Sequence, residues 1–232
     1  MAARLNHRLH GQTFVLLGER ALFWEEAQLL VVADTHLGKA DIFRKAGIPL
    51  PRGSTAADLD RLSQLLDYWT PKGLIFLGDL VHGDIEDPRY FIRQVSHWRD
   101  RHRGIQLLLA TGNHDRRAEN LLTAFRFDGI EAQWELAPFR FTHRPQQSVS
   151  GYGVAGHVHP AVKVVGQGRQ RETLPCFCFG PKVALLPAFG GFTGTQIIRP
   201  SRDDRVFVVA DESVLGLESP SAHSHTHGRK GV

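Results

Sequence analysis

The stretch IQLLLATGNHD, residues 105 to 115, changes from a continuous apolar run into a glycine followed by an amide, an imidazole and a carboxylate. A short apolar run without alternation is typical of a strand that is buried on both faces, as in a parallel sheet. Asn113, His114 and Asp115 would then stand where the strand ends, which is where open α/β sheets bind ligands. Alone, the pentapeptide TGNHD is also consistent with a turn, so the interpretation depends on partners elsewhere in the chain.

Two further apolar runs have the same design. They are LLVVAD at residues 29 to 34 and GLIFLGD at residues 73 to 79. Each ends in a small polar cluster, formed by Asp34 with His36 and by Asp79 with His82. Because the carboxyl ends of neighbouring parallel strands meet at one edge of a sheet, we expect the three clusters to converge there.

Two amphipathic helices are predicted between these strands. The first begins near Thr55, with Asp58 three residues later as a capping box, and its apolar stripe consists of Leu59, Leu62, Leu66 and Trp69. The second follows Pro88 and ends in the basic run RDRHR, where cations suit the helix dipole. Its apolar positions are Phe91, Ile92, Val95 and Trp98.

The second half of the chain has a different character. From about residue 130 the segments are short, β-rich and separated by Gly or Pro, namely FRFTH, GYGVAGHVH, AVKVV, TLPCFCF, VALLPAF, TQIIR and RVFVVA. This pattern predicts a second, largely antiparallel sheet that packs face to face with the first. We expect residues 1–216 to form one domain. The Ser-, His-, Gly- and Pro-rich segment 217–232 is predicted to be a disordered tail, with solvation favoured over adventitious metal binding for its three histidines.

The length and composition of the chain limit its domain size, the charge of its partners and its location in the cell. The chain has 232 residues, 42% of them hydrophobic, which is enough for one large α/β domain or two small ones. A net charge of +4 and a pI near 9.3 lean toward a polyanionic partner without requiring nucleic acid. No apolar stretch reaches the length of a membrane span, and the N-terminus is too polar for a signal peptide. Two cysteines, Cys176 and Cys178, form no disulfide framework, so we expect a cytoplasmic protein.

The β-rich half adds three histidines to the polar clusters, and together they make an oxygen and nitrogen ligand set without a thiolate. The set comprises Asp34, His36, Asp79, Asn113, His143, His157 and His159. Alone, Asp34 would be interpreted as a carboxylate that caps a turn, and GHVH as a half-exposed strand. Seven ligands are too many for one tetrahedral ion and about right for two ions of Mn, Fe or Zn that share a carboxylate.

The motifs DTH (34–36), GDLVH (78–82), GNHD (112–115) and GHVH (156–159), in this order, resemble the calcineurin-like metallophosphoesterase superfamily. That resemblance implies a four-layer α/β/β/α sandwich. The segments DTHLGKADIFRKAGIPLPRGST and LPCFCFGPKVALLPAFGGFTG, with the THRP context of His143, are similar to ligase-associated DNA damage response endonucleases of the PdeM type. This subfamily implies manganese-dependent cleavage of single-stranded DNA in DNA repair, with a functional link to a DNA ligase and a helicase.

The resemblance also implies a role for each ligand. Asp34, His36 and His159 would hold the first metal ion. Asn113, His143 and His157 would hold the second, and Asp79 would bridge both. A shared carboxylate offsets the repulsion between two cations about 3.5 to 4 Å apart, and a metal-activated water attacks phosphorus in line with the leaving oxygen.

Three more residues receive catalytic roles from the same resemblance. His114 would donate to a non-bridging oxygen or protonate the leaving group, and Asp115 would orient its other nitrogen. His82 is either a contact to the substrate phosphate or a residue that supports the ligands, with the two interpretations weighted evenly.

Basic residues in loops after the ligand segments are candidates for phosphate contact, and for each one a solvated surface charge is the competing interpretation. They are Lys39, Arg44, Lys45, Arg52, Arg116 and Arg117. Phe43 could stack on an unpaired base or belong to the core. Cys176 and Cys178 are most simply two residues of one strand, with no thiolate site implied.

Other functions use the same motifs. The main alternative is a phosphomonoesterase or small-molecule phosphodiesterase, because one dinuclear core supports all of these reactions. A protein phosphatase is disfavoured, since GDLVHG at residues 78–83 lacks the GDxxDRG pattern. A non-catalytic scaffold is disfavoured because the ligands and His114 are all present.

Overall fold

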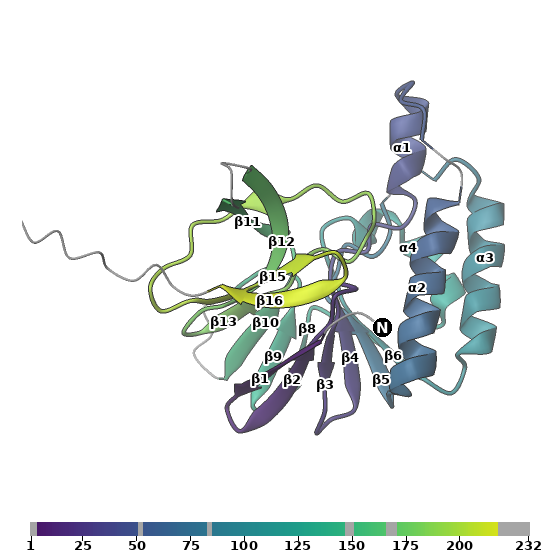
Figure 1. The fold of residues 1–232 in the computed structure, drawn as a ribbon. Coiled ribbons are helices and arrows are strands. Elements are labelled where there is room, and N and C mark those ends of the chain that lie inside the picture. The colour runs from purple at the N-terminus through teal and green to yellow at the C-terminus, as the bar shows by residue number, and fades with distance from the viewer. Residues whose placement is uncertain (1–3, 51–52, 83–84, 147–150, 166–170, 218–232) are drawn as a thin grey trace, which may run out of the picture.

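The computed structural model describes residues 4–50, 53–82, 85–146, 151–165 and 171–217. Its strands form two sheets (Figure 1). The first sheet contains β1 (Leu5–Leu9), β2 (Gln12–Leu16), β3 (Leu22–Trp24), β4 (Leu29–Val32), β5 (Gly73–Phe76), β6 (Gln106–Ala110) and β7 (Gly129–Glu131). The second contains β8 (Gln133–Leu136), β9 (Phe139–Thr142), β10 (Tyr152–Ala155), β11 (Pro160–Val165), β12 (Arg171–Phe179), β13 (Val183–Leu185), β14 (Gln196–Ile197), β15 (Arg205–Ala210) and β16 (Ser213–Leu217).

The first sheet runs in chain order from β1 to β7 and has two halves. Strands β1 to β4 form an antiparallel meander, whereas β4, β5, β6 and β7 are parallel. The three predicted apolar runs are β4, β5 and β6, neighbours in the parallel half, so this prediction is confirmed. Strands β1 to β3, which the sequence pattern did not predict, extend the sheet on the β4 side.

The described helices lie in one part of the chain. They are α1 (Lys39–Lys45), α2 (Ser54–Trp69), α3 (Pro88–Arg101) and α4 (Glu119–Leu122), with 3-10 turns η1 (Asp115–Arg117) and η2 (Thr123–Phe125). Leu59, Leu62 and Leu66 of α2 and Val95 and Trp98 of α3 are buried, together with side chains of β4, β5 and β6. Helices α2 and α3 therefore cover the outer face of the first sheet, as Figure 1 shows.

The start of α2 differs from the prediction. The residue before the helix is Gly53, with φ of 100°, and no side chain caps the helix. The Asp58 carboxylate instead accepts a hydrogen bond from the backbone N–H of Gly191, at 3.2 Å. The predicted capping box is wrong because Asp58 has a tertiary partner. For α3 the predicted start at Pro88 is confirmed, and the Asp87 side chain accepts a bond from the Tyr90 N–H.

The second sheet is mixed, and most of its strand pairings are antiparallel, so the predicted largely antiparallel character is confirmed. Strand β10 pairs parallel with both β9 and β13, while β12 pairs antiparallel with β11, β13 and β15. Cys176 and Cys178 lie on β12 and are buried, and burial raises the pKa of both thiols to about 12. The interpretation of these cysteines as two residues of one strand is confirmed.

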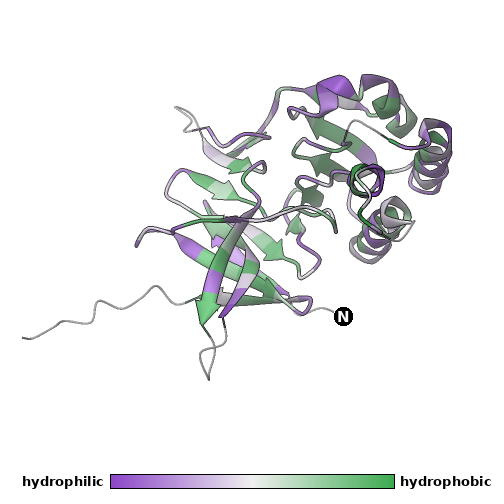
Figure 2. Ribbon diagram, turned by 90° about the horizontal axis from the view of Figure 1, so that it is seen from above, coloured by the Kyte–Doolittle hydropathy of each residue, from purple (hydrophilic) through white to green (hydrophobic). Residues whose placement is uncertain are grey.

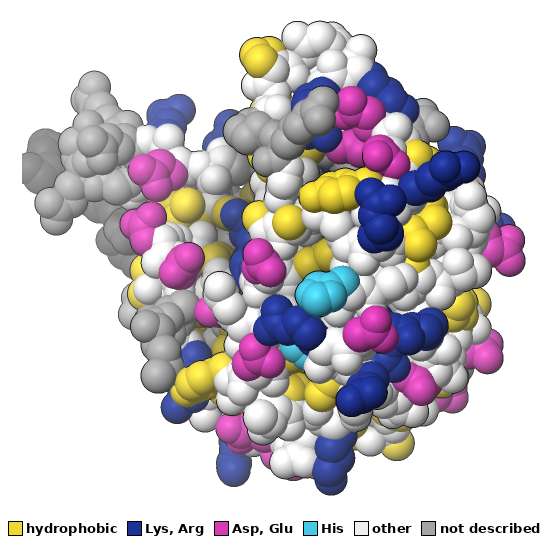
Figure 3. Space-filling model, turned by 90° about the vertical axis from the view of Figure 1, so that its right-hand side faces the viewer, with side chains coloured by type: hydrophobic (Ala, Val, Ile, Leu, Met, Phe, Trp, Pro, Cys, Tyr) yellow, Lys and Arg dark blue, Asp and Glu magenta, His cyan; other side chains and the backbone are white. Residues whose placement is uncertain are grey.

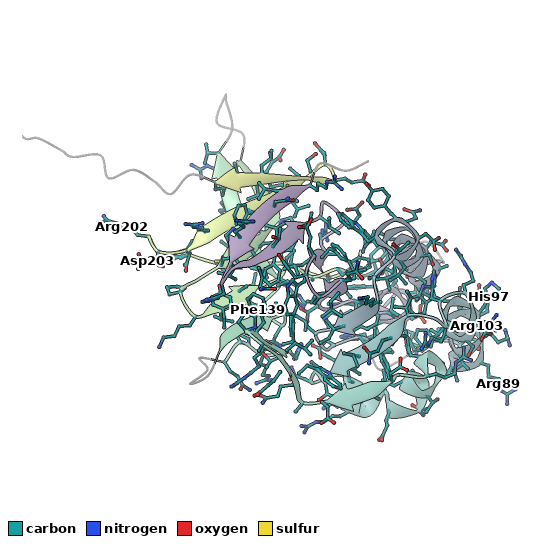
Figure 4. All side chains as sticks on the ribbon, turned by 90° about the horizontal axis from the view of Figure 1, so that it is seen from below. Arg89, His97, Arg103, Phe139, Arg202 and Asp203 are labelled. Carbon is teal, nitrogen blue, oxygen red and sulfur yellow. The ribbon has the colours of Figure 1, made fainter. Side chains whose placement is uncertain are left out.

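The two sheets pack against each other through a shared aromatic layer. Phe14 of β2 lies 4.6 Å from Phe139 of β9, measured between ring centroids, and Trp24 of β3 lies 5.0 Å from the same ring. Figure 4 shows Phe139 among the strands, while His97 and Arg103 point outward near α3. In Figure 2 many of the strands are green, the colour of apolar residues. The prediction of two packed mixed sheets is confirmed. Of the two outer helical layers that the four-layer arrangement implies, the described residues supply the one over the first sheet, through α2, α3 and α4.

The surface of the described residues is mixed in charge. Figure 3 shows Lys, Arg, Asp and Glu side chains interspersed on one side of the molecule, without a field of one sign on that face. Within the same residues, none of the helices combines the length and the apolar character that crossing a bilayer requires. The predicted tail, apart from Leu217 at the end of β16, lies outside the described residues.

Candidate metal centre

The ends of the parallel strands bring the motif residues together. Asp34 follows β4, Asp79 follows β5 and Asn113 follows β6, two to three residues beyond the last residue of each strand. The second sheet contributes His143 at the end of β9 and, after β10, His157 and His159. The backbone φ is positive at Asp34, His36, Asp79, His157 and His159. Left-handed backbone at non-glycine residues carries strain and concentrates at functional sites, so the chain bends sharply to aim these side chains.

The glycines of the motifs leave room for close approach of neighbouring loops. A Cβ atom on Gly112 would lie 2.3 Å from the backbone nitrogen of Asp79 and 2.4 Å from its Oδ1. A Cβ atom on Gly156 would lie 2.6 Å from Oδ2 of Asp34. Each glycine thus precedes a candidate ligand and packs directly against another one, which gives a physical reason for the GNHD and GHVH patterns.

Six of the seven predicted ligands form two clusters that could each hold a metal ion. One cluster comprises Asp34, His36 and His159, and the other comprises Asp79, His143 and His157. Within each cluster the candidate ligand atoms all lie within 4.8 Å of one another. The family resemblance implied this grouping for five of these side chains, with Asp79 shared between the two groups.

Backbone carbonyls fix the orientation of two of the histidine rings. His143 Nδ1 donates to the carbonyl of Leu77 at 2.8 Å, and His159 Nδ1 donates to the carbonyl of Gly194 at 3.0 Å. A carbonyl only accepts, so the proton of each neutral ring is on Nδ1 and the lone pair is on Nε2. The Nε2 lone pairs then face His157 and His36 at 3.0 and 3.3 Å. Metal-binding histidines usually have this arrangement, in which one ring nitrogen donates to a protein oxygen and the other is left to bind the metal.

The two carboxylates have unequal surroundings. Asp34 is fully buried, and its Oδ2 accepts a bond from the His157 N–H at 2.7 Å. Its Oδ1 is buried and has no hydrogen-bond partner among the described residues, although His159 Nε2 is 3.4 Å away. An orphaned carboxylate oxygen that faces imidazole lone pairs suits a cation.

Asp79 lies between the two clusters. Its Oδ2 is 3.4 Å from His143 Nε2 in its own cluster and 3.9 Å from His36 Nε2 in the other. Its Oδ1 accepts a bond from the His114 N–H at 2.9 Å. The residues present therefore fit a pair of divalent ions with a shared carboxylate.

The surroundings favour the ligating forms of Asp79 and His36 but not that of His143: burial alone would lower the pKa of His143, whereas the hydrogen bond to Asp79 and the charge of Asp79 raise it. Burial alone would raise the pKa of Asp79, but hydrogen bonds from His143 and the His114 N–H, with the charges of both rings, hold that pKa well below its usual range. Burial, and then the Lys39 ammonium, lower the pKa of His36 to about 3. A carboxylate and a neutral imidazole are the ligating forms.

His114 and His82 stand beside the clusters. Their rings stack at 4.3 Å between centroids, and His114 Nε2 is 4.0 Å from Asp79 Oδ2. The His114 side chain is 37% exposed, so it borders the clusters and also reaches solvent. His82 Nδ1 is 3.1 Å from His36 Nδ1. A contact to a candidate ligand agrees with the supporting role considered for His82.

Asp115 has different partners from those expected. Its Oδ1 accepts a bond from the Leu80 N–H at 2.8 Å, and its Oδ2 accepts one from the Gly112 N–H at 2.7 Å. Both oxygens of this buried carboxylate are thus engaged with backbone rather than with the ring of His114. Asp115 ties the loop 111–115 to the end of β5, which positions His114 through the backbone. We therefore correct its expected role from a direct partner of His114 to a brace for the loop.

Asn113 has an unforeseen neighbour. Its Oδ1, the atom that would contact a metal ion, accepts a hydrogen bond from Arg144 Nε at 2.9 Å. Arg144 is exposed and directly follows His143 in the chain. Arg144 was not among the predicted site residues, although its place next to the predicted ligand His143 was a usable signal.

The predicted phosphate contacts do not share one location. Lys39 lies close enough to Asp34 and Asp79 for their charges to act on its ammonium group. Arg44 forms ion pairs with Asp41 and Glu86 instead, and Lys45 is exposed on α1. Arg116 and Arg117 are exposed on η1, directly after the loop 111–115. Arg52 lies outside the described residues. Phe43 is half-buried on α1, which decides neither of its two interpretations.

A second loop, residues 189–194, forms hydrogen bonds with residues of the site. Phe189 N–H donates to the carbonyl of Ala33 at 2.8 Å, and Gly190 N–H donates to that of Asp34 at 3.3 Å. Arg61 of α2 donates to the Phe189 carbonyl, and its guanidinium lies 3.9 Å from the centre of the Phe189 ring. The sequence resemblance includes this segment, but no role was predicted for it.

The fold is that of an α/β metallophosphoesterase sandwich, with its candidate ligands where the two sheets meet. A family model described as calcineurin-like phosphoesterase matches residues 27–177. The chain therefore belongs to the calcineurin-like phosphoesterase family and is a hydrolase of phosphate esters.

Solved structures give two further comparisons. The chain is similar to the Pseudomonas putida nuclease MPE, with 36% identity over 92% of this chain and 100% of that chain, at a TM-score of 0.79. It is also similar to Yfce, a phosphoesterase from E. coli, with 15% identity over 82% of this chain and 98% of that chain, at a TM-score of 0.42. A search of curated proteins finds no significant match.

Proposed function

We propose that the two clusters hold a pair of divalent metal ions, with Asp79 as the bridging ligand. Asp34, His36 and His159 would hold one ion, and His143, His157 and Asn113 the other. The orphaned Oδ1 of Asp34 and the position of Asp79 Oδ2 between both clusters support this assignment. Manganese is the proposed metal, because oxygen and nitrogen ligands without thiolate suit it, as they also suit Fe or Zn.

When bound, the two ions would supply a water activated near neutral pH and would neutralise charge on the phosphate. The chain's own residues position the rest of the reaction. His114 would donate to a non-bridging phosphate oxygen or protonate the leaving oxygen, since its ring reaches solvent beside Asp79. The Asp79 carboxylate holds the backbone of His114, and Asp115 holds that of Gly112.

The proposed substrate is a DNA phosphodiester, with single-stranded DNA cleaved internally during DNA repair. The observation that carries this proposal is the similarity to a nuclease that spans nearly the whole of both chains at 36% identity. Lys39 near the clusters, with Arg116, Arg117 and Arg144 on the adjoining surface, would attract the phosphate backbone. A functional link to a DNA ligase and a helicase is proposed on the sequence resemblance alone.

Nicking of a closed circular single-stranded DNA in the presence of manganese tests the proposal. Linearisation by the wild type, with no cutting after chelation, is expected, because a circle offers no end to an exonuclease or a monoesterase. The His114→Ala variant should retain its metal content and lose at least about 100-fold in cutting rate. An intact circle, in a preparation that still hydrolyses a small phosphate ester, would point to a phosphomonoesterase or small-molecule phosphodiesterase instead.

A further inference from the structure

A pocket borders the loop 111–115, which also carries the candidate ligand Asn113 and His114. It has a volume of about 680 Å³ and is lined by residues of that loop, of η1, and of the segment from α4 to β7. Thr111 and Asp115, at the two ends of the loop, belong to its wall. The volume lies within the range of small-molecule binding sites.

The pocket combines an apolar surface with charged side chains of both signs, because Arg116, Arg126, Asp115 and Glu119 also line it. Leu122, Phe127 and Ile130 line it, and Ile130 is 47% exposed although it is a large apolar side chain. The Phe127 ring stacks on that of Phe125 at 5.4 Å and is only half-buried, which leaves part of its surface accessible. Exposed Arg116 stands at the same pocket. An accessible aromatic ring and an apolar wall beside a cation suit a flat apolar group that is attached to an anion.

The pocket and the site share the loop 111–115, so neighbouring residues of one segment contribute to each. Asp115 directly follows His114, so their Cα atoms are about 3.8 Å apart, and Thr111 precedes Asn113 by two residues. The Asp115 carboxylate, although it belongs to the wall, is occupied by the Gly112 and Leu80 N–H groups. It therefore presents less negative charge to an incoming phosphodiester than a free carboxylate would.

We propose that this pocket binds a nucleobase of the strand whose phosphate lies at the metal centre. The inference rests on the proposed function and adds a subsite to it. A base that enters the pocket would contact Phe127 and Ile130, while Arg116 contacts the phosphate next to the scissile one. Stacking is tolerant of base identity, so the pocket would select unpaired DNA over duplex without selecting a sequence.

The test is a double-mutant cycle in which one change is made in the protein and the other in the substrate. The protein variants are Ile130→Glu and, as a matched control on an exposed apolar residue of β16, Leu215→Glu. The substrates are a uniform thymidine oligonucleotide, a series of the same oligonucleotides with one abasic position, and bis(p-nitrophenyl) phosphate, which carries no base. We expect Ile130→Glu to lower oligonucleotide cleavage about tenfold relative to the small diester, and Leu215→Glu to leave that ratio unchanged.

The abasic series keeps the inference testable even if Ile130→Glu folds poorly. In the wild type, cleavage should fall about tenfold at one phosphate at a fixed offset from the missing base, and Ile130→Glu should add little to that loss. Equal cutting at all positions, or independent effects of the variant and the abasic site, would overturn the subsite and leave the proposed function standing. A wild type that cleaves the small diester but no oligonucleotide would overturn both.

Discussion

The strand ends of the first sheet and the loop 189–194 both border the candidate metal centre, yet they supply different atoms. The strand ends present side chains, such as Asp34 and Asp79, that point into the clusters. The loop presents backbone: its Gly190 N–H bonds to the Asp34 carbonyl, and the carbonyl of Gly194 accepts from His159 Nδ1. One region is expected to bind the ions, whereas the other holds the ligands in place.

This difference has a consequence for mutation. A ligand acts by its own chemistry, so its loss should remove the ion directly. A loop that acts through its backbone depends on whatever anchors it, and here the anchors are Asp58 and Arg61 of α2. Changes in the two regions should therefore differ in the size of their effect on metal affinity.

The largest effect is expected from Asp79→Ala. Because Asp79 Oδ2 faces histidines of both clusters, its removal should lower manganese content at both positions and activity by more than about 100-fold, beyond the loss typical of a supporting residue. Metal analysis of the purified protein after dialysis measures the first effect, and small-diester hydrolysis measures the second. The exposed Asp67→Ala serves as the control. A fully metallated Asp79→Ala protein would disprove the bridging assignment.

A smaller effect is expected from Asp58→Asn, which tests the loop. The Asp58 carboxylate accepts the Gly191 N–H and pairs with Arg61 at 3.1 Å, so the amide leaves Arg61 without its anion. Loss of one partner in such a largely buried pair should lower the free energy of unfolding by about 2 kcal/mol. The looser loop should weaken manganese binding about tenfold through His159.

The matched control for this variant is Asp60→Asn, an exposed aspartate on the same helix. Chelator competition gives the manganese affinity of each protein, and urea unfolding of the metal-free proteins gives their stability. If Asp58→Asn lost stability but kept wild-type manganese affinity, the loop would be a structural element without influence on the ligands.

The two regions also differ in how far their residues could be predicted from the sequence. Buried parallel strands leave a strong signal, because a continuous apolar run is followed abruptly by Asp, His or Asn. Asp34, Asp79 and His114 were found in this way, because the parallel pairing of β4, β5 and β6 brings the ends of these strands close together. The six clustered side chains are all Asp or His, which commonly bind metal ions, so residue type and expected position both pointed to a metal site.

The remainder left weaker signals. Asp58 follows a helix start in a pattern that suggests a cap, and only the tertiary fold brings Gly191 to it. Strands β1 to β3 are short and were not distinguished from the surrounding turns. Arg144 is an exposed arginine like many others, and its bond to Asn113 depends on the approach of β9 to the end of β6. Interactions that join distant segments through backbone or surface groups leave no recognisable pattern in the local sequence, so they could not be predicted from it.

The smallest effect on the metal centre is expected from a histidine that belongs to neither region. His7 of β1 is 5% exposed and lies 4.3 Å from the ring of Phe179, and its buried Nε2 has no hydrogen-bond partner among the described residues. Burial, and then the charge of Arg205, lower the pKa of His7 to about 4. In this apolar setting, unlike that of His143 beside two carboxylates, the imidazole is a packing group.

In mild acid, His7 is therefore protonated in the unfolded chain and neutral in the folded chain. As pH falls from about 6.5 toward 4, the unfolded chain binds a proton at His7 before the folded chain does, so stability is lost by up to about 1.4 kcal/mol per pH unit. His7→Phe should remove this component while keeping manganese content unchanged. Urea unfolding of both proteins at pH 7.5 and pH 5 measures the difference. Equal losses of stability would mean that His7 is already protonated in the fold, and altered metal content would mean that buried histidines outside the clusters also influence the site.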